Sequence, residues 1–255
     1  MDRSIVLTGR RERIAAFVWQ HVLLIGSLFL MTLGVALCVR SNQGSSVISS
    51  LPLAFSLAGA DGLGVPDLSI GTYTYIMNFI LVGAQIIVLR RRFEAVQLFQ
   101  LLIGFVFGAL IDLNMALTSM LQCDSLWSGM AVQFAGCTVM GVGIAFEVRC
   151  GSVTMPGEGI TVAISRVSGM SFPKTKMIVD TTLVGLAVVA CYIFWGAWQW
   201  NITGVGTVFA MVYVGYVVKL INPHIAWFDR ILDNRPGFGR YYYGLKRILV
   251  KSLRQ

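Results

Sequence analysis

The sequence predicts an all-α membrane protein with six transmembrane helices, arranged as two three-helix repeats of opposite orientation. Three observations predict it: apolar segments of spanning length, basic residues on one side only, and an internal repeat. Hydrophobic residues make up 56% of the 255 residues, while charged residues make up 13%, about half the share of soluble domains. Because the mean hydropathy is +0.74, we expect the lipid bilayer to be the chain's main partner.

The predicted spans are 16–39, 72–89, 96–118, 126–148, 176–198 and 204–221. Each carries few charges over roughly the length that a bilayer core of about 30 Å requires. Lipid offers no hydrogen-bond partner to the backbone, so the spans should be helices. The basic start MDRSIVLTGRRER precedes a run that is too long for a signal peptide and lacks a small-residue cleavage site. We therefore expect an uncleaved first span.

Basic residues give the orientation. With the N-terminus inside, nineteen of the twenty Lys and Arg residues lie on the inner side, and only Arg40 lies outside. Both termini are then cytoplasmic. The net charge of +8 is explained by this placement, so no nucleic-acid partner is expected.

Two segments repeat each other. GVALCVRSNQGSSVISSLPLAFS (34–56) and GIAFEVRCGSVTMPGEGITVAIS (143–165) are identical at six of 23 positions, at an offset of 143 − 34 = 109. Later spans align too, and they pair Asn78 with Asp180. Because each half has an odd number of spans, the second half is inverted, a plan found in many secondary transporters. The predicted organisation is a basic N-terminus (1–15), a first repeat (16–118), an inverted second repeat (126–222) and a basic tail (223–255).

In each half the first span ends in Val-Arg, and a Gly/Ser-rich elbow and a short apolar run follow. These runs, 45–59 and 157–169, are too short to span a bilayer and too apolar for ordinary loops. We interpret them as two re-entrant half-helices. The alternative is that they lie flat at the interface and only link spans.

A half-helix N-terminus exposes unpaired N–H groups and a partial positive charge, which favours an anion. Arg40 and Arg149 are repeat mates beside these elbows, and an Arg there is suited to clamp a carboxylate or phosphate. The alternative for Arg149 is simple positive-inside anchoring. Glu158 either binds a cation or proton, or caps the helix start. The candidate substrate-binding residues are Arg40, Ser49, Arg149, Gly157, Glu158 and Gly159.

Asn78 and Asp180 lie inside their spans, where a carboxylate is costly and usually functional. Lys176 is four residues before Asp180, so the two share a helix face and can pair. These three residues are the candidates for coupling or for a buried polar contact. We interpret Glu147, two residues before Arg149, as the partner of a nearby base.

The motifs VRSNQGSSVISSLP and MPGEGI, with KxxxD at Lys176 and Asp180, resemble the YczE/YyaS/YitT family of bacterial inner-membrane proteins. The resemblance covers about residues 20–220. It implies a multi-pass protein of the bacterial plasma membrane, and it implies no established reaction.

The pattern favours a transporter or channel for a small solute, preferably an anion, that works by alternating access between the repeats. The alternatives are a non-transporting scaffold or regulator and, less favoured, a membrane enzyme. HExxH, GxSxG and Cys-His pairings are absent from the sequence, so no enzyme activity, cofactor or metal is predicted. A polar cavity reaching Arg40, Glu158 and Asp180 would favour the transporter, and a dry centre would favour the scaffold.

Two further features have local interpretations. The five cysteines are scattered, and we interpret them as small apolar residues. The less favoured alternative is that Cys123, in an outer loop, is a reactive thiol. The tail segment 241–255, YYYGLKRILVKSLRQ, predicts a basic amphipathic helix on anionic lipids of the inner leaflet. The oligomeric state stays open.

Overall fold

The structure, a computed structural model, describes residues 10–123, 125–150 and 155–225, without the side chains of residues 10–17, 95, 96 and 149. The described residues form helices and connections, with no strand among them. The elements are α1 (Arg10–Arg40), α2 (Val47–Ala60), α3 (Ile70–Leu89), η1 (Arg90–Arg92), η2 (Ala95–Leu98), α4 (Phe99–Leu117), α5 (Leu126–Arg149), α6 (Pro156–Ser168), α7 (Phe172–Trp195) and α8 (Val205–Ile221). The predicted tail helix lies outside the described residues.

Within the described residues, five helices are long and apolar enough to cross a membrane: α1 from Val18 onward, α3, α4, α5 and α7. This is compatible with a multi-pass membrane protein. Helix α8 is also apolar but has 17 residues, about 25 Å at 1.5 Å per residue. Helix α7 begins earlier than the predicted residue 176, because Ser171 precedes it and a proline in its first turn favours helix initiation.

Many large apolar side chains remain on the outside. Ile87, Ile193 and Val212 are each exposed by more than 70%. A water-soluble protein rarely leaves such a surface uncovered, whereas lipid tails cover it without cost. The outer face of the helices therefore fits a hydrocarbon environment.

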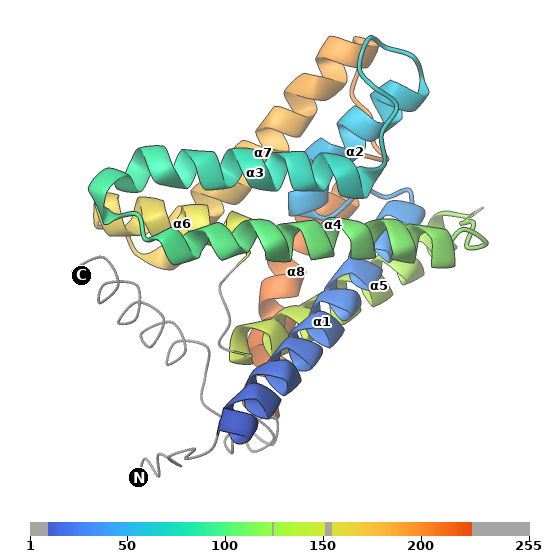
Figure 1. The fold of residues 1–255 in the computed structure, drawn as a ribbon. Coiled ribbons are helices and arrows are strands. Elements are labelled where there is room, and N and C mark those ends of the chain that lie inside the picture. Colours follow the sequence, from blue (N-terminus) through green and yellow to red (C-terminus); the bar gives the residue numbers. More distant parts are fainter. Residues whose placement is uncertain (1–9, 124, 151–154, 226–255) are drawn as a thin grey trace.

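Helices α1 and α5 form a closely packed antiparallel pair (Figure 1). A Cβ atom added at Gly34 would lie 2.6 Å from the Gly136 carbonyl oxygen and from Met140. A Cβ atom added at Gly143 would lie 2.6 Å from the Met31 backbone nitrogen. The two glycines thus allow a backbone approach that no larger residue permits.

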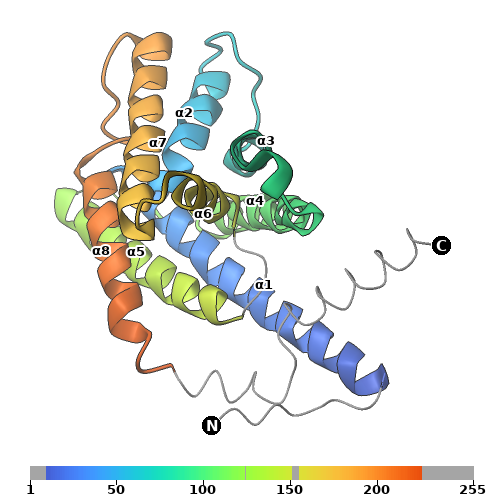
Figure 2. The same cartoon turned by 90° about the vertical axis from the view of Figure 1, so that its left-hand side faces the viewer.

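The remaining helices pack around this pair (Figures 1 and 2). Helix α4 packs on α1, and α8 packs on α5. Helix α3 packs on α6, and α2 packs on α7. Helix α3 also packs along α4, but α7 makes no comparable contact with α8.

Two contacts hold α3 to α4. A Cβ atom added at Gly108 would lie 2.5 Å from the Gly71 carbonyl oxygen, so the backbones touch. The Asp112 carboxylate accepts hydrogen bonds from the Gly71 N–H (2.8 Å) and the Ser69 hydroxyl (2.6 Å) at the start of α3. The carboxylate therefore satisfies one free N–H group of the first turn, and the helix dipole favours its negative charge.

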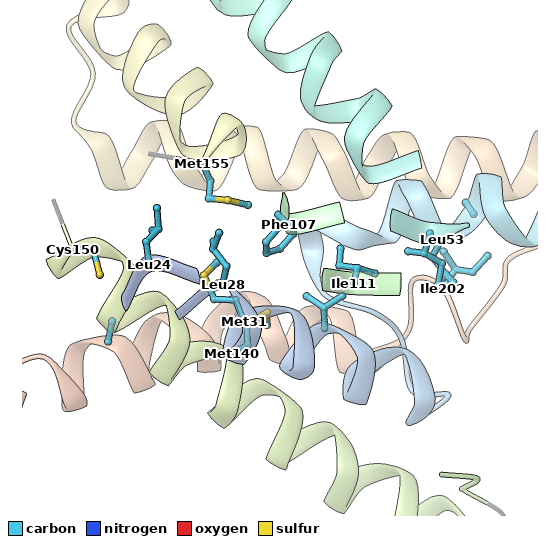
Figure 3. Packing of buried hydrophobic residues seen from close by; sticks show 14 of the residues in the cluster. Leu24, Leu28, Met31, Leu53, Phe107, Ile111, Met140, Cys150, Met155 and Ile202 are labelled. Carbon is cyan, nitrogen blue, oxygen red and sulfur yellow. The ribbon is translucent and has the colours of Figure 1, made fainter. Parts of the chain in front are cut away.

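The core lies where α4 crosses the α1–α5 pair (Figure 3). Phe107 and Ile111 of α4 are 1% and 0% exposed, and Leu28, Met31 and Met140 belong to the same cluster. Close packing of this kind holds helices together in lipid, where the hydrophobic effect contributes little.

Candidate functional site

The two short helices α2 and α6 begin next to each other. Met155 precedes α6, and Pro156 occupies its first turn, where the missing N–H costs nothing. A Cβ atom added at Gly157 would lie 2.9 Å from Cδ1 of Ile48, in the first turn of α2. The MPGEGI elbow therefore brings the N-termini of both short helices to one place, where the terminal methyl group of Ile48 lies against Gly157.

A cavity of about 530 Å³ opens at this point. Ser46, Val47 and Ile48 from the start of α2 and Gly157 and Glu158 from the start of α6 contribute to its lining. The rest of the lining is mostly apolar and comes from α1, α4, α5, α7 and α8. A largely apolar cavity with a few convergent polar groups is the usual form of a small-molecule site.

Four ionisable side chains line this cavity: Glu147, Glu158, Lys176 and Asp180. The Lys176 ammonium lies 2.7 Å from a carboxylate oxygen of Asp180, as the four-residue spacing predicts. Among the described lining residues, three acids thus face one base. A bare anion gains from the helix N-termini and from Lys176, but ionised carboxylates oppose it.

Glu158 stands in the first turn of α6, outside the helices that are candidates to cross the membrane. Burial raises the pKa of its carboxyl; the nearby Lys176 charge lowers that pKa, and Asp180 raises it further. Glu147, on α5, is only 4% exposed and lines the same cavity. Two carboxylates that line one largely apolar cavity resist simultaneous ionisation, so this site is suited to hold a proton.

Two other elbow residues, Ser49 and Gly159, are not among the residues that line this cavity. Ser49 is buried, and its hydroxyl lies 2.6 Å from the Ser46 hydroxyl. A Cβ atom added at Gly159 would lie 2.6 Å from the side-chain oxygen of Gln100. The Gln85 amide donates to Gln100 (2.9 Å) and to the Pro156 carbonyl (3.1 Å), so α3 and α4 hold the start of α6.

The structure does not bring Arg40 to this cavity. Its guanidinium donates to the Met115 carbonyl at 2.8 Å, near the end of α4, and lines a second cavity. The two cavities have no lining residue in common. Of the three residues expected on one cavity, Glu158 and Asp180 lie together and Arg40 lies elsewhere. Arg149 ends α5, and its side chain lies outside the described part of the chain.

Asn78 is fully buried on α3, and neither side-chain atom has a hydrogen-bond partner. It lies against α4, where a Cβ atom added at Gly104 would be 3.1 Å from its amide nitrogen. Its repeat mate Asp180 lines the open cavity, whereas Asn78 does not. The two mates are therefore in different surroundings.

Sequence reasoning gave too little weight to Glu147 and missed the Gln85–Gln100 contact. An acidic residue inside a predicted span was the available signal for Glu147, since such residues are rarely incidental. No comparable signal marks the glutamines, because their pairing depends on how α3, α4 and α6 pack. Within the described ranges, no group of three or more His, Cys, Asp and Glu residues is placed to hold a metal ion.

Residues 18–223 match a family of unknown function, DUF6198. The chain belongs to the DUF6198 family. The DUF6198 region includes all the cavity-lining residues. No curated protein and no solved structure matches the chain. The resemblance to the YczE/YyaS/YitT family stays a prediction.

Proposed function

We propose that this DUF6198 protein is a secondary transporter of a small anion, carried together with protons, and that the cavity at Glu158 is its substrate site. The observation that carries the proposal is the meeting of two helix N-termini on a cavity lined by Glu147, Glu158, Lys176 and Asp180. Partial positive charge from the two termini attracts an anion. The carboxylates admit it when they are protonated, which couples anion and proton.

An inverted repeat is part of the proposal, and the α1–α5 crossing supports it. Gly34 approaches Gly136 and Met140, while Gly143 approaches Ser27 and Met31. The repeat offset of 109 relates Gly34 to Gly143, Ser27 to Gly136 and Met31 to Met140. Gly136 and Met140, which contact Gly34, are thus the repeat mates of Ser27 and Met31, which contact Gly143. A two-fold axis through the crossing requires this relation.

The helix packing gives further support. Under the repeat, α1, α2, α3 and α4 correspond to α5, α6, α7 and α8. The contact of α4 with α1 then matches that of α8 with α5, and the contact of α3 with α6 matches that of α7 with α2. On this basis we infer that α8 is the sixth span and that α2 and α6 are re-entrant half-helices.

The helix pair α7 and α8 differs from its counterpart, α3 and α4, and we infer that it marks the access route of the solute. Helices α3 and α4 touch at Gly71 and Gly108, but α7 and α8 are separated by the cavity. Gly215, the mate of Gly108, lines the cavity, and a Cβ atom added there would have no neighbouring atom within 4 Å. Alternating access would close α7 onto α8 while α3 opens from α4, which would expose Asn78 in turn.

The proposal is tested in proteoliposomes with currents on solid-supported membranes and isotope uptake. The panel holds inorganic phosphate, mono- and dicarboxylates, amino acids, organic cations and neutral solutes, each with and without an inward proton gradient. We expect saturable, proton-stimulated uptake of one anion class. Lys176→Gln, which removes the one base among the described lining residues, should abolish it. Glu158→Gln, which imitates the protonated acid, should lose proton-driven accumulation but keep solute exchange.

Asp67→Asn is the matched control, because Asp67 is an exposed acid that does not line the cavity. Its uptake should equal that of the unaltered protein. Uptake of a cation would refute the anion assignment. If neither assay detects transport of any solute in the panel, transport is refuted and the scaffold interpretation is favoured.

A further inference from the structure

We propose that the second cavity, at Arg40, is a separate binding site for a small oxyanion such as a carboxylate or phosphate group. This cavity has a volume of about 420 Å³. Its polar lining residues are Arg40, Asn42, Gln122, Cys123 and Asn201. The site is distinct from the substrate cavity and does not depend on the transport proposal.

The charge of Arg40 is uncompensated within the described lining. One terminal nitrogen donates to the Met115 carbonyl, and Nε is buried without a partner. No Asp or Glu is among the lining residues of this cavity. A cation in a partly enclosed site is costly unless an anion balances it, so the site favours an anionic ligand.

The residue types indicate which anion. The planar guanidinium offers paired N–H donors that match two oxygens of a carboxylate or phosphate. Asn42, Gln122 and Asn201 add neutral amides, which can bind hydroxyl or carbonyl groups next to the anionic group. Asn42, two residues after the end of α1, has a left-handed backbone (φ 56°), a conformation that Asn tolerates better than most residues. The volume is adequate for a small metabolite.

A purely structural role makes a different prediction. If Arg40 only caps the carbonyls at the end of α4, anions should have no saturable effect at this cavity. The carboxylate of Asp124 is a second competitor, because it follows Cys123 in sequence and lies outside the described residues. The Asp124→Asn variant removes that competitor.

Cys123 is a native reporter for the test. It lines the cavity and is partly exposed, whereas Cys38, Cys137, Cys150 and Cys191 are buried. The full-length protein in lipid nanodiscs is treated with an anionic and a cationic methanethiosulfonate reagent. The rate of Cys123 modification is measured, and the rate for Cys123→Ser is subtracted. The ratio of the anionic to the cationic modification rate should be roughly tenfold higher in the unaltered protein than in Arg40→Gln.

Ligand binding is measured as protection of Cys123 against an uncharged maleimide. Inorganic phosphate and acetate are titrated at constant ionic strength. Protection should saturate in the unaltered protein, weaken in Arg40→Lys, which keeps the charge but loses the paired donors, and vanish in Arg40→Gln. Circular dichroism and gel filtration establish that each variant is folded, and Arg40→Lys carries the test if Arg40→Gln is not.

Three results would overturn the proposal. Equal reagent preference in the unaltered protein and Arg40→Gln would show that the guanidinium does not act on the cavity. Protection that is linear in anion concentration would show only ionic screening. Protection that is seen only with Asp124→Asn would make the Asp124 carboxylate the resident anion.

Discussion

The crossing of α1 and α5 allows a quantitative test of the inverted repeat, through Gly34→Ala, Gly143→Ala and the control Gly26→Ala. The added methyl group at Gly34 or Gly143 would lie 2.6 Å from neighbouring backbone, against 3.4 Å or more for ordinary contact. The helices would have to separate by about 0.8 Å, the difference between these two values, and would lose packing along the crossing. Gly26 has no atom within 4 Å of the added methyl group.

All three variants gain similar helix propensity, about 1 kcal/mol, so the comparison with Gly26→Ala isolates the overpacking. We expect Gly34→Ala and Gly143→Ala to lower the free energy of unfolding by about 1–3 kcal/mol relative to Gly26→Ala. The measurement is reversible unfolding in mixed micelles by SDS titration, followed by tryptophan fluorescence. If all three variants agree within about 0.5 kcal/mol, the close approach is refuted. A large cost at only one of the two crossing glycines would refute the two-fold relation.

Three more predictions follow from the α3–α4 contact and from the substrate cavity. Gly108→Ala places a methyl group 2.5 Å from the Gly71 carbonyl oxygen and should lower the free energy of unfolding by about 1–3 kcal/mol. Gly215→Leu places its side chain in open space, so it should change stability by less than about 1 kcal/mol but abolish uptake. Retained uptake in Gly215→Leu would contradict closure of α7 onto α8. Asp112→Asn should cost about 1 kcal/mol in the same titration, because a charge-assisted hydrogen bond to the Gly71 N–H becomes a neutral one; an unchanged midpoint would assign the contact no energetic role. At a fixed anion gradient, anion uptake should fall as pH rises through the elevated pKa of Glu158, because the ionised carboxylate repels the anion. Glu158→Gln should flatten this part of the pH profile. If the variant has the same pH profile as the unaltered protein, Glu158 is not the group that controls anion entry.

Local properties of the chain made the helices predictable. Length and apolarity are read directly from consecutive residues, so the predicted segments 72–89, 126–148 and 204–221 lie within three residues of α3, α5 and α8 at both ends. The glycine-rich elbow also marked the start of α6, where Pro156 begins the helix. The Lys176–Asp180 pair followed from helical spacing alone.

The convergence of the site was not local, and it was only partly predictable. Arg40 was expected on the same cavity as Glu158 and Asp180, but its guanidinium contacts the end of α4 and lines a separate cavity. Glu147 lines the same cavity as Glu158 and Lys176, which its place in the sequence does not indicate. Which side of a helix faces a cavity depends on the angle and depth at which the helix crosses its neighbours.

The sequence by itself determined that this chain suits a bilayer, roughly where its apolar helices lie, and that its halves share a pattern. Hydropathy, helix signals and repeat spacing can be read directly from the order of the residues. Only the tertiary structure decided that the starts of α2 and α6 meet, that α3 closes on α4, and that α7 stays apart from α8. Those outcomes depend on close contacts between residues far apart in the chain, such as Gly71 with Gly108 and Gly157 with Ile48. A glycine in a sequence does not indicate which backbone will approach it, because packing between distant helices makes that selection.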